Sequence, residues 1–174
     1  MNRAVFLDRD GVINHDINYI HKVEDLLILS GVVEGLLALQ KEFLLFIVTN
    51  QSGIGRGIYK EDQYHVFQNE LLKRLENNGV KIIKTYYCPH SPEHKCACRK
   101  PHPKFLLEAE KEYGIDLSRS FMIGDRKSDV QAGHNAGTVT VFIESDLNDP
   151  SFWLKEPHYS AKNFSDAVKW VLRH

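Results

Sequence analysis

The sequence predicts an α/β fold in which a Rossmann-like parallel sheet carries helices on both faces. Short apolar runs typical of buried strands alternate with longer segments of helical periodicity along the 174 residues. Several apolar runs end in small polar or acidic residues, as strands do at the functional edge of a parallel sheet. Hydrophobic residues make up 43% of the chain and charged residues 26%, the composition of an ordinary globular protein. We therefore expect a single domain over residues 1–174 with right-handed crossovers.

Five apolar runs are expected to form the strands. The first run ends in Asp-Arg-Asp-Gly, the second in Thr-Asn-Gln-Ser-Gly, and the fourth is followed by Gly-Asp. Because parallel strands end at the same edge of a sheet, these polar residues should meet in one crevice. The predicted strands comprise residues 3–7, 43–48, 82–87, 120–123 and 138–143.

Five segments at helical spacing should cover this sheet. Phe67, Leu71 and Leu75 recur every four residues and define the apolar face of one helix. Pro103 suits the first turn of the next helix, and Gly114 suits its end. The expected helices comprise residues 33–42, 61–78, 103–114, 128–136 and 161–172.

The charge balance argues against nucleic acid or a membrane as a partner. Lys and Arg together number 22 against 23 Asp and Glu, so the net charge of −1 gives no global attraction to polyanions. Phe152, Trp153 and Trp170 have no basic stripe around them and are expected to pack rather than to stack on bases. The apolar run at residues 4–7 is far too short for a signal peptide or a spanning helix. We expect a cytoplasmic protein.

Acidic residues at two strand ends predict a magnesium site. Asp8 and Asp10 are two residues apart, so the strand period of two can direct both carboxylates to the same side. Two close carboxylates repel each other unless a cation lies beside them. Asp125 follows another strand and would complete a set of oxygen ligands that suits Mg²⁺.

The same crevice contains the groups that phosphoryl transfer needs. An aspartate carboxylate can accept a phosphoryl group as a nucleophile, and Asp10 can serve as the acid and then the base. The hydroxyl of Thr49 can donate to a phosphoryl oxygen, and Lys100 can supply a compact positive charge.

Four motifs in this chain resemble those of the haloacid dehalogenase superfamily, and they come in the family's order. Asp129, the last residue of the fourth motif, is expected to help hold the site together rather than to bind metal. The motifs are Asp-Arg-Asp-Gly-Val-Ile-Asn at 8–14, Thr-Asn-Gln-Ser at 49–52, Lys-Pro at 100–101, and Gly-Asp-Arg-Lys-Ser-Asp at 124–129.

The resemblance implies a covalent mechanism. By it, Asp8 is the nucleophile that forms an aspartyl-phosphate and Asp10 is the acid and base. Mg²⁺ would be bound by the side chains of Asp8 and Asp125 and by the main-chain carbonyl of Asp10. Thr49 and Lys100 would stabilise the transferring phosphoryl group.

A cluster of Cys and His residues predicts a structural zinc site. Cys88, His90, Cys96 and Cys98 offer three thiolates and one imidazole within eleven residues. His94 or His102 could replace His90 as the fourth ligand. Four protein ligands leave no open position on the metal, so the zinc would pin a long loop beside Lys100 rather than take part in the chemistry.

Two branches of the superfamily carry such a zinc loop, the heptose 1,7-bisphosphate 7-phosphatases and the histidinol-phosphate phosphatases. The second motif through Gly57 and the loop after the first motif are similar to the former. The five-residue spacing between His90 and Cys96, and the Arg126 that follows Gly-Asp, are similar to the latter. We favour the sugar bisphosphate, because Arg56 or Arg99 could bind a second phosphate through a planar fork.

The remaining expectations concern substrate contacts and assembly. No insertion is large enough to form a capping domain, so short loops around an open site must select the small sugar phosphate. Asp16 could instead attract the amine of histidinol phosphate, and a zinc-stabilised module that binds phosphate without turnover is the alternative of another class. We expect a monomer. The expected substrate-binding residues are Asp16, Tyr19, Asn50, Gln51, Ser52, Arg56 and Arg99.

Overall fold

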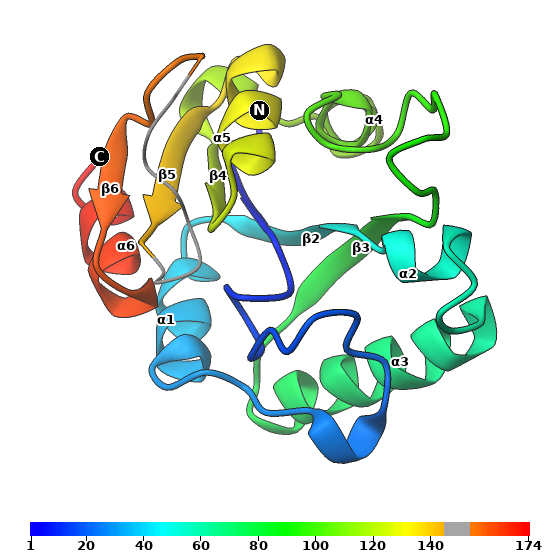
Figure 1. Cartoon of the computed structure of the whole chain (residues 1–174). Helices are drawn as coiled ribbons and strands as arrows, with labels where there is room; N and C mark the ends of the chain where they lie inside the picture. The colour runs from blue at the N-terminus through cyan, green and yellow to red at the C-terminus, as the bar shows by residue number, and fades with distance from the viewer. Residues whose placement is uncertain (145–153) are drawn as a thin grey trace.

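A six-stranded parallel sheet forms the centre of the computed structural model, which describes residues 1–144 and 154–174 (Figure 1). The strand order is β3-β2-β1-β4-β5-β6, and every neighbouring pair is parallel. The predicted α/β architecture is confirmed. The strands are β1 (Ala4–Leu7), β2 (Leu44–Asn50), β3 (Ile82–Cys88), β4 (Phe121–Gly124), β5 (Val139–Ile143) and β6 (Tyr159–Ala161).

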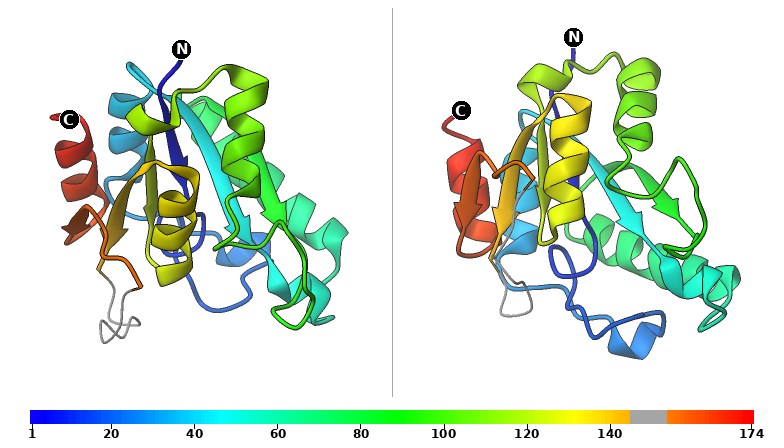
Figure 2. Two further views of the ribbon diagram at one scale, coloured as in Figure 1. Left: turned by 90° about the horizontal axis from the view of Figure 1, so that it is seen from above. Right: turned by 45° about the horizontal axis from the view of Figure 1, so that its top comes forward.

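Helices cover both faces of the sheet, as predicted (Figures 1 and 2). Three helices bury their apolar stripes with Val5, Leu45 and Ile123 on one face: α1 (Val32–Leu39), α3 (Glu61–Asn77) and α6 (Phe164–Val171). The other face, with Phe6 and Met122, is covered by α4 (Lys104–Tyr113) and α5 (Lys127–Ala136). Two buried layers of apolar side chains therefore hold the strand ends in place.

The structure corrects the predicted C-terminal helix. Ala161 belongs to β6 and not to a helix, and α6 begins only at Phe164. The side chain of Asn163 accepts a hydrogen bond from the backbone of Asp166 and caps this helix. A strand of three residues is too short to show a periodicity, which is why the sequence pattern merged it into the helix.

Besides β6, three short elements of the described residues were not predicted. The helix α2 (Ser52–Gly55) directly follows β2, and two 3₁₀ helices, η1 (Val23–Asp25) and η2 (Leu117–Arg119), lie in connecting segments. Strand β2 also extends to Asn50, two residues further than expected. As a result, Thr49 and Asn50 lie on the rigid end of a strand rather than in a loop.

The strand order places a topological switch point at β1. The chain proceeds from β1 outward to β2 and β3 on one side, and through β4 to β5 and β6 on the other. Crevices form outside the carboxyl ends of the strands at such a point. Asp8 and Asp125 directly follow the adjacent strands β1 and β4, so the fold delivers both carboxylates to this crevice.

The sequence predicts that the aromatic residues near the C-terminus pack in the fold and that the chain has no spanning helix. Trp170 packs against the core and stacks on Tyr159 with 4.9 Å between ring centroids. Phe152 and Trp153 lie outside the described residues. Among the helices of the described ranges, none has the length and apolar character needed to cross a bilayer.

Candidate active site

Three buried carboxylates form a cluster at the carboxyl edge of the sheet. Asp8 and Asp125 come from the ends of β1 and β4, and Asp129 comes from the first turn of α5. One carboxylate oxygen of each lies within 4.8 Å of the others. All three residues are almost completely buried. The cluster thus concentrates negative charge where little water can reach it.

Two glycines make room for these carboxylates. Gly11 has a φ of +85°, and a Cβ atom at this position would lie 2.2 Å from Oδ2 of Asp125. A Cβ atom at Gly124 would lie 2.2 Å from the Cβ of Asp129. Side chains at either position would push the acidic cluster apart, so the glycines are part of its construction.

Lys100 is a buried cation that faces this cluster. Its ammonium lies 2.9 Å from Oδ1 of Asp8 and 2.7 Å from Oδ1 of Asp129, and it also donates to the carbonyl oxygen of Val48. The side chain is almost completely buried. Burial alone would lower the pKa of Lys100, but the charges of Asp129 and Asp8 outweigh burial and raise it. Lys100 is therefore a fixed positive charge.

The cluster fits a divalent cation. Three carboxylates and one ammonium have a formal net charge of −2 when all are ionised. Burial raises the pKa of Asp125 to about 8, with a smaller contribution from the neighbouring acidic charges. Burial also raises the pKa of Asp8 to about 6, although the charge of Lys100 opposes this shift. A doubly charged ion with a preference for carboxylate oxygen would offset this repulsion. The donor set suits Mg²⁺.

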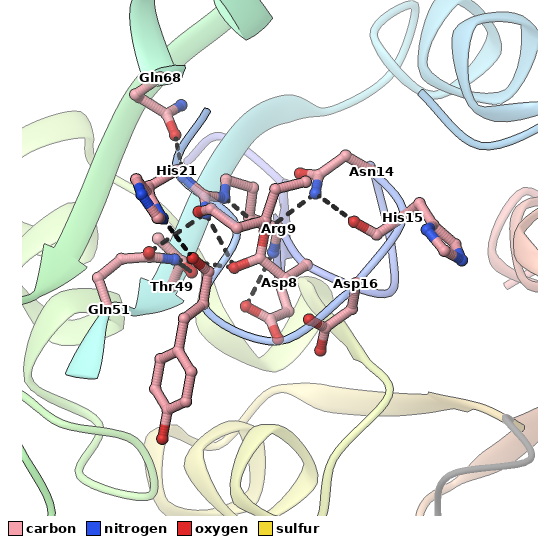
Figure 3. A network of polar contacts seen from close by, with 12 residues as sticks. Asp8, Arg9, Asn14, His15, Asp16, His21, Thr49, Gln51 and Gln68 are labelled. Carbon is pink, nitrogen blue, oxygen red and sulfur yellow. Dashed lines mark hydrogen bonds and ion pairs between the residues drawn. The ribbon is translucent and has the colours of Figure 1, made fainter. Parts of the chain in front are cut away.

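Asp10 is held by the buried guanidinium of Arg9, which Figure 3 labels within a network of polar contacts. Arg9 donates from Nε to Oδ1 of Asp10 at 2.8 Å and from an NH2 nitrogen to Oδ2 at 2.9 Å. Asn14 donates to Oδ1 and Gln51 to Oδ2. Burial would raise the pKa of Asp10, but the charge of Arg9 and these hydrogen bonds outweigh burial and lower it. Asp10 is thus an oriented, ionised carboxylate.

Arg9 itself is completely buried and is tied into the fold on several sides. Its guanidinium lies 4.6 Å from the ring centroid of Phe67 and contacts the side-chain oxygen of Gln68, both on α3. It also donates to the side-chain oxygen of Gln51 at 3.2 Å. Sequence reasoning missed this residue, because β1 ends at Leu7 and no strand period extends to Arg9.

Side chains of the second motif, at the end of β2, form hydrogen bonds that hold other residues of the site in place. Gln51 donates to Thr49 Oγ1 and accepts from the hydroxyl of Tyr59 at 2.6 Å. The side chain of Asn50 accepts a hydrogen bond from the backbone nitrogen of Lys100 and donates to its backbone oxygen. In the structure the side-chain amides of Asn50 and Gln51 orient neighbouring residues of the site. Both residues were expected to contact the substrate, and the sequence did not indicate this supporting role.

A polar cavity opens above the acidic cluster and brings most of the predicted residues together. Two guanidinium groups, of Arg99 and Arg126, line it together with Asn18, Tyr59 and Ser128. The predicted residues that line it are Asp8, Asp10, Asp16, Tyr19, Thr49, Asn50, Gln51, Ser52, Arg99 and Lys100. Asp125 lies beside it in the cluster with Asp8.

Arg56 does not line this cavity. It follows α2 and forms an ion pair with Glu93, 3.2 Å away and exposed. Arg126 lies inside the cavity instead, where its NH2 nitrogen donates to Oδ2 of Asp16 at 2.8 Å. The signal for Arg126 was present in the fourth motif, but nothing in the sequence indicated its pairing with Asp16.

The Cys and His residues converge on one point, as expected for a zinc site. The Sγ atom of Cys88 lies 3.6 Å from that of Cys96 and 3.2 Å from that of Cys98, and Nδ1 of His90 lies 3.3 Å from Cys98 Sγ. With Zn–S bonds of about 2.3 Å, sulfur atoms at the corners of a tetrahedron are roughly 3.8 Å apart. The four side chains therefore fit tetrahedral Zn²⁺.

The cluster geometry selects among the candidate histidines. Nδ1 of His94 lies 2.9 Å from the hydroxyl of Ser91, and neither His94 nor His102 belongs to the group of converging ligand atoms in the part of the chain that the structure describes. The loop that carries the cluster also contacts α2, because the backbone nitrogen of Gly55 donates to the carbonyl oxygen of Pro89. A bound zinc ion would therefore stiffen the cavity wall that carries Arg99.

Comparison with known sequences identifies several relatives. A family model described as HAD-hydrolase-like matches residues 97–167. The D-glycero-β-D-manno-heptose-1,7-bisphosphate 7-phosphatase of Helicobacter pylori strain J99 is 41% identical over 178 residues, covering 98% of this chain and 97% of the relative. The D-glycero-α-D-manno-heptose-1,7-bisphosphate 7-phosphatase of Campylobacter jejuni is 45% identical over 142 residues, covering 81% of each chain.

The structure is also similar to a solved one. The crystal structure of the D,D-heptose 1,7-bisphosphate phosphatase of B. bronchiseptica, in complex with magnesium and phosphate, superposes with a TM-score of 0.90. The two sequences are 26% identical, and the match covers 98% of both chains. The sheet, its helices and their order are therefore shared along nearly the whole length.

Proposed function

The chain belongs to the D-glycero-D-manno-heptose-1,7-bisphosphate 7-phosphatase family of HAD-like hydrolases, and we propose that it removes the C7 phosphate of D-glycero-D-manno-heptose 1,7-bisphosphate. The product would be a sugar 1-phosphate for surface-polysaccharide synthesis in the cytoplasm. The observation that carries the proposal is the buried cluster of Asp8, Asp125 and Asp129 with Lys100, at the base of a cavity lined by guanidinium groups.

In the mechanism that we propose, a carboxylate oxygen of Asp8 attacks the phosphorus of the C7 phosphate. The bond from phosphorus to the sugar oxygen breaks, and that oxygen takes a proton from Asp10. A water oxygen then attacks the phosphorus of the aspartyl-phosphate and gives a proton to Asp10. The bond from phosphorus to Asp8 breaks and inorganic phosphate is released. Arg9 keeps Asp10 ionised in the free site, which suits Asp10 to accept this proton, and the protonated Asp10 formed here is the acid that protonates the sugar oxygen of the next substrate.

Two metals belong to the proposal. Asp8, Asp125 and the main-chain carbonyl of Asp10 would hold Mg²⁺, which when bound supplies positive charge to the phosphoryl oxygens. Lys100 adds a fixed charge on the same side, and Thr49 is placed on the end of β2 to donate to a phosphoryl oxygen. Zn²⁺ at Cys88, His90, Cys96 and Cys98 would be structural.

The cavity favours a bisphosphate over histidinol phosphate. The amine of histidinol phosphate is a cation and needs an unpaired acidic neighbour, but the carboxylate of Asp16 is already paired with Arg126. The two guanidinium groups of Arg99 and Arg126 instead suit a substrate that carries negative charge on its leaving group.

The test is phosphate release from both anomers of heptose 1,7-bisphosphate and from histidinol phosphate at matched concentrations, with Mg²⁺ and with a chelator. We expect heptose bisphosphate to be preferred by at least about 100-fold in kcat/KM, which corresponds to about 2.7 kcal/mol of transition-state discrimination. A preference of this size for histidinol phosphate would contradict the proposal. The Asp8→Asn variant should show no turnover, and unchanged release by that variant would contradict the covalent mechanism.

A further inference from the structure

We propose that Tyr59 is a positioning residue that acts through Gln51 to make the hydroxyl of Thr49 a donor to the transferring phosphoryl group. The inference rests on the proposed function, in which Thr49 contacts that group. All three residues line the cavity, and all three are almost completely buried. Tyr59 follows the short helix α2, so it supports the site from outside the four motifs.

The side-chain amide of Gln51 makes four hydrogen bonds, and its charged partners determine where its oxygen and its nitrogen lie (Figure 3). The oxygen accepts from the hydroxyl of Tyr59 at 2.6 Å and from Arg9 at 3.2 Å. The nitrogen donates to Oδ2 of Asp10 at 2.9 Å and to Oγ1 of Thr49 at 2.8 Å. A guanidinium can only donate and an ionised carboxylate can only accept. Arg9 must therefore face the amide oxygen, and Asp10 must face the amide nitrogen.

This orientation decides the direction of the hydrogen bond at Thr49. The Oγ1 atom of Thr49 accepts from the amide nitrogen, so the hydroxyl hydrogen of Thr49 is directed to another acceptor. Thr49 lies near the end of β2 and lines the cavity, where a phosphoryl oxygen would be that acceptor. A reversed amide would instead present its oxygen to Thr49 and take the hydrogen that the substrate needs. The orientation of Gln51 therefore controls whether Thr49 can stabilise the transition state.

Tyr59 favours the orientation in which Thr49 is a donor. Burial raises the pKa of Tyr59 to about 12, although the charge of Arg9 opposes this shift, so the hydroxyl keeps its proton. The amide oxygen of Gln51 accepts this proton in a short hydrogen bond. A reversed amide would present an NH2 group, which cannot accept, to the buried hydroxyl hydrogen of Tyr59. The hydroxyl of Tyr59 therefore adds to the preference that Arg9 and Asp10 establish.

The aromatic ring of Tyr59 is itself held by two segments of the chain. A Cβ atom at Gly53, in α2, would lie 2.1 Å from a carbon of this ring, so the absent side chain of Gly53 makes room for it. The ring of His21, from the loop after β1, stacks on Tyr59 with 4.7 Å between centroids. Because both segments contact the ring, its hydroxyl has a defined place beside Gln51.

The first experiment measures kcat/KM of Tyr59→Phe for heptose 1,7-bisphosphate and for p-nitrophenyl phosphate. The second substrate separates the two residues to which Gln51 donates, because p-nitrophenolate leaves without a proton from Asp10. On both substrates, Tyr59→Phe should lower kcat/KM by about fivefold and Thr49→Val by about 100-fold. A loss in Tyr59→Phe that is confined to heptose bisphosphate would assign its effect to Asp10 and overturn the inference.

Double variants test whether the effect of Tyr59 passes through Gln51 to Thr49. Combined with Thr49→Val or with Gln51→Met, Tyr59→Phe should lower kcat/KM by less than about twofold, because the groups through which it acts are gone. Combined with Thr49→Ser, which keeps a hydroxyl, the fivefold loss should remain. Equal losses from Tyr59→Phe in all these proteins would show a general structural effect, and no loss in the otherwise wild-type enzyme would show no effect. Either result would overturn the inference.

Tyr64→Phe is the matched control, because Tyr64 is also a buried tyrosine near Arg9, with 5.6 Å from the guanidinium to its ring centroid. Its hydroxyl has no hydrogen-bond partner among the residues that the structure describes. Tyr64→Phe should leave both kcat/KM values unchanged, and thermal unfolding checks that each variant is folded. A wild-type enzyme that hydrolyses p-nitrophenyl phosphate but not heptose bisphosphate would overturn the proposed substrate. The inference would then be decided on p-nitrophenyl phosphate, so the two failures are distinct.

Discussion

At the scale of single residues, the geometry of the site depends on residues that take no part in the proposed reaction. Asp10 depends on Arg9 for its orientation, and Asp125 depends on the missing side chain of Gly11 for its space. Both supporting residues lie within the first motif; Arg9 is the neighbour of Asp10, whereas Gly11 leaves space for an aspartate of the fourth motif. The motif therefore encodes the shape of the site as well as its reactive groups.

Gly11→Ala is expected to damage the metal site more than the fold. The left-handed backbone conformation should cost about 1–2 kcal/mol of stability, and the new methyl group would displace the carboxylate of Asp125. Gly137→Ala is the matched control, because Gly137 has the same φ of +85° and no heavy atom of the described residues lies within 4 Å of its Cβ position. Urea unfolding should show similar losses for both variants, but only Gly11→Ala should lose Mg²⁺-dependent phosphate release. Equal activity of the two variants would contradict this account.

Arg9→Met should destabilise the whole protein by about 3 kcal/mol, because it leaves the buried carboxylate of Asp10 without its charge partner. Lys104→Met, which removes an exposed ion pair with Glu108, should cost less than about 1 kcal/mol. Both values can be measured by urea unfolding. In the double variant with Asp10→Asn, part of the Arg9→Met loss should be recovered, and strictly additive losses would show that the two residues are energetically independent.

At the scale of elements, the sequence predicts features that depend on neighbouring residues and misses those that depend on contacts between distant segments. The polar residues at the ends of β1, β2 and β4 mark these ends to within two residues, so the position of the crevice follows from the pattern. Strand β6 has three residues and is defined only by its pairing with β5. The ion pair of Asp16 with Arg126 joins residues 110 positions apart, and no periodicity reports such a contact.

The loop between β3 and α4 gives an element-scale prediction. Cys96→Ser should reduce zinc content well below one ion per chain and lower the melting temperature, because metal binding contributes to folding. The activity should fall as well, because this loop carries Arg99 and Lys100. His94→Ala should retain zinc, since His94 contacts Ser91 outside the cluster. Metal analysis of both proteins checks this, and full zinc occupancy in Cys96→Ser would contradict the assignment.

At the scale of the whole molecule, we expect folding and metal binding to be coupled. The acidic cluster joins the ends of β1 and β4 to the start of α5, so repulsion within it opposes the packing of three elements. A cation that binds only the folded form stabilises it by mass action, with about 2.7 kcal/mol at one hundred times the dissociation constant. We therefore expect the metal-free protein to be less stable than the metal-bound form.

Asp8→Asn tests this coupling, because it removes one of the three buried charges and keeps the shape of the side chain. Without divalent cations at pH 8, we expect the variant to be more stable than the wild type by about 1 kcal/mol, although it loses the ion pair with Lys100. The reason is that burial and the neighbouring carboxylates raise the pKa of Asp8 to about 6 in spite of that pair, so its ionised form is disfavoured in the fold.

Added Mg²⁺ should reverse this order of stability. The wild type should gain several degrees in melting temperature, whereas Asp8→Asn should gain little because a ligand is missing. Asp25→Asn, at an exposed acidic residue of η1, should behave like the wild type in both conditions. If Asp8→Asn were less stable than the wild type without metal, the ion pair with Lys100 would outweigh the repulsion, and the cluster would be an ordinary buried salt bridge rather than a site built to receive a cation.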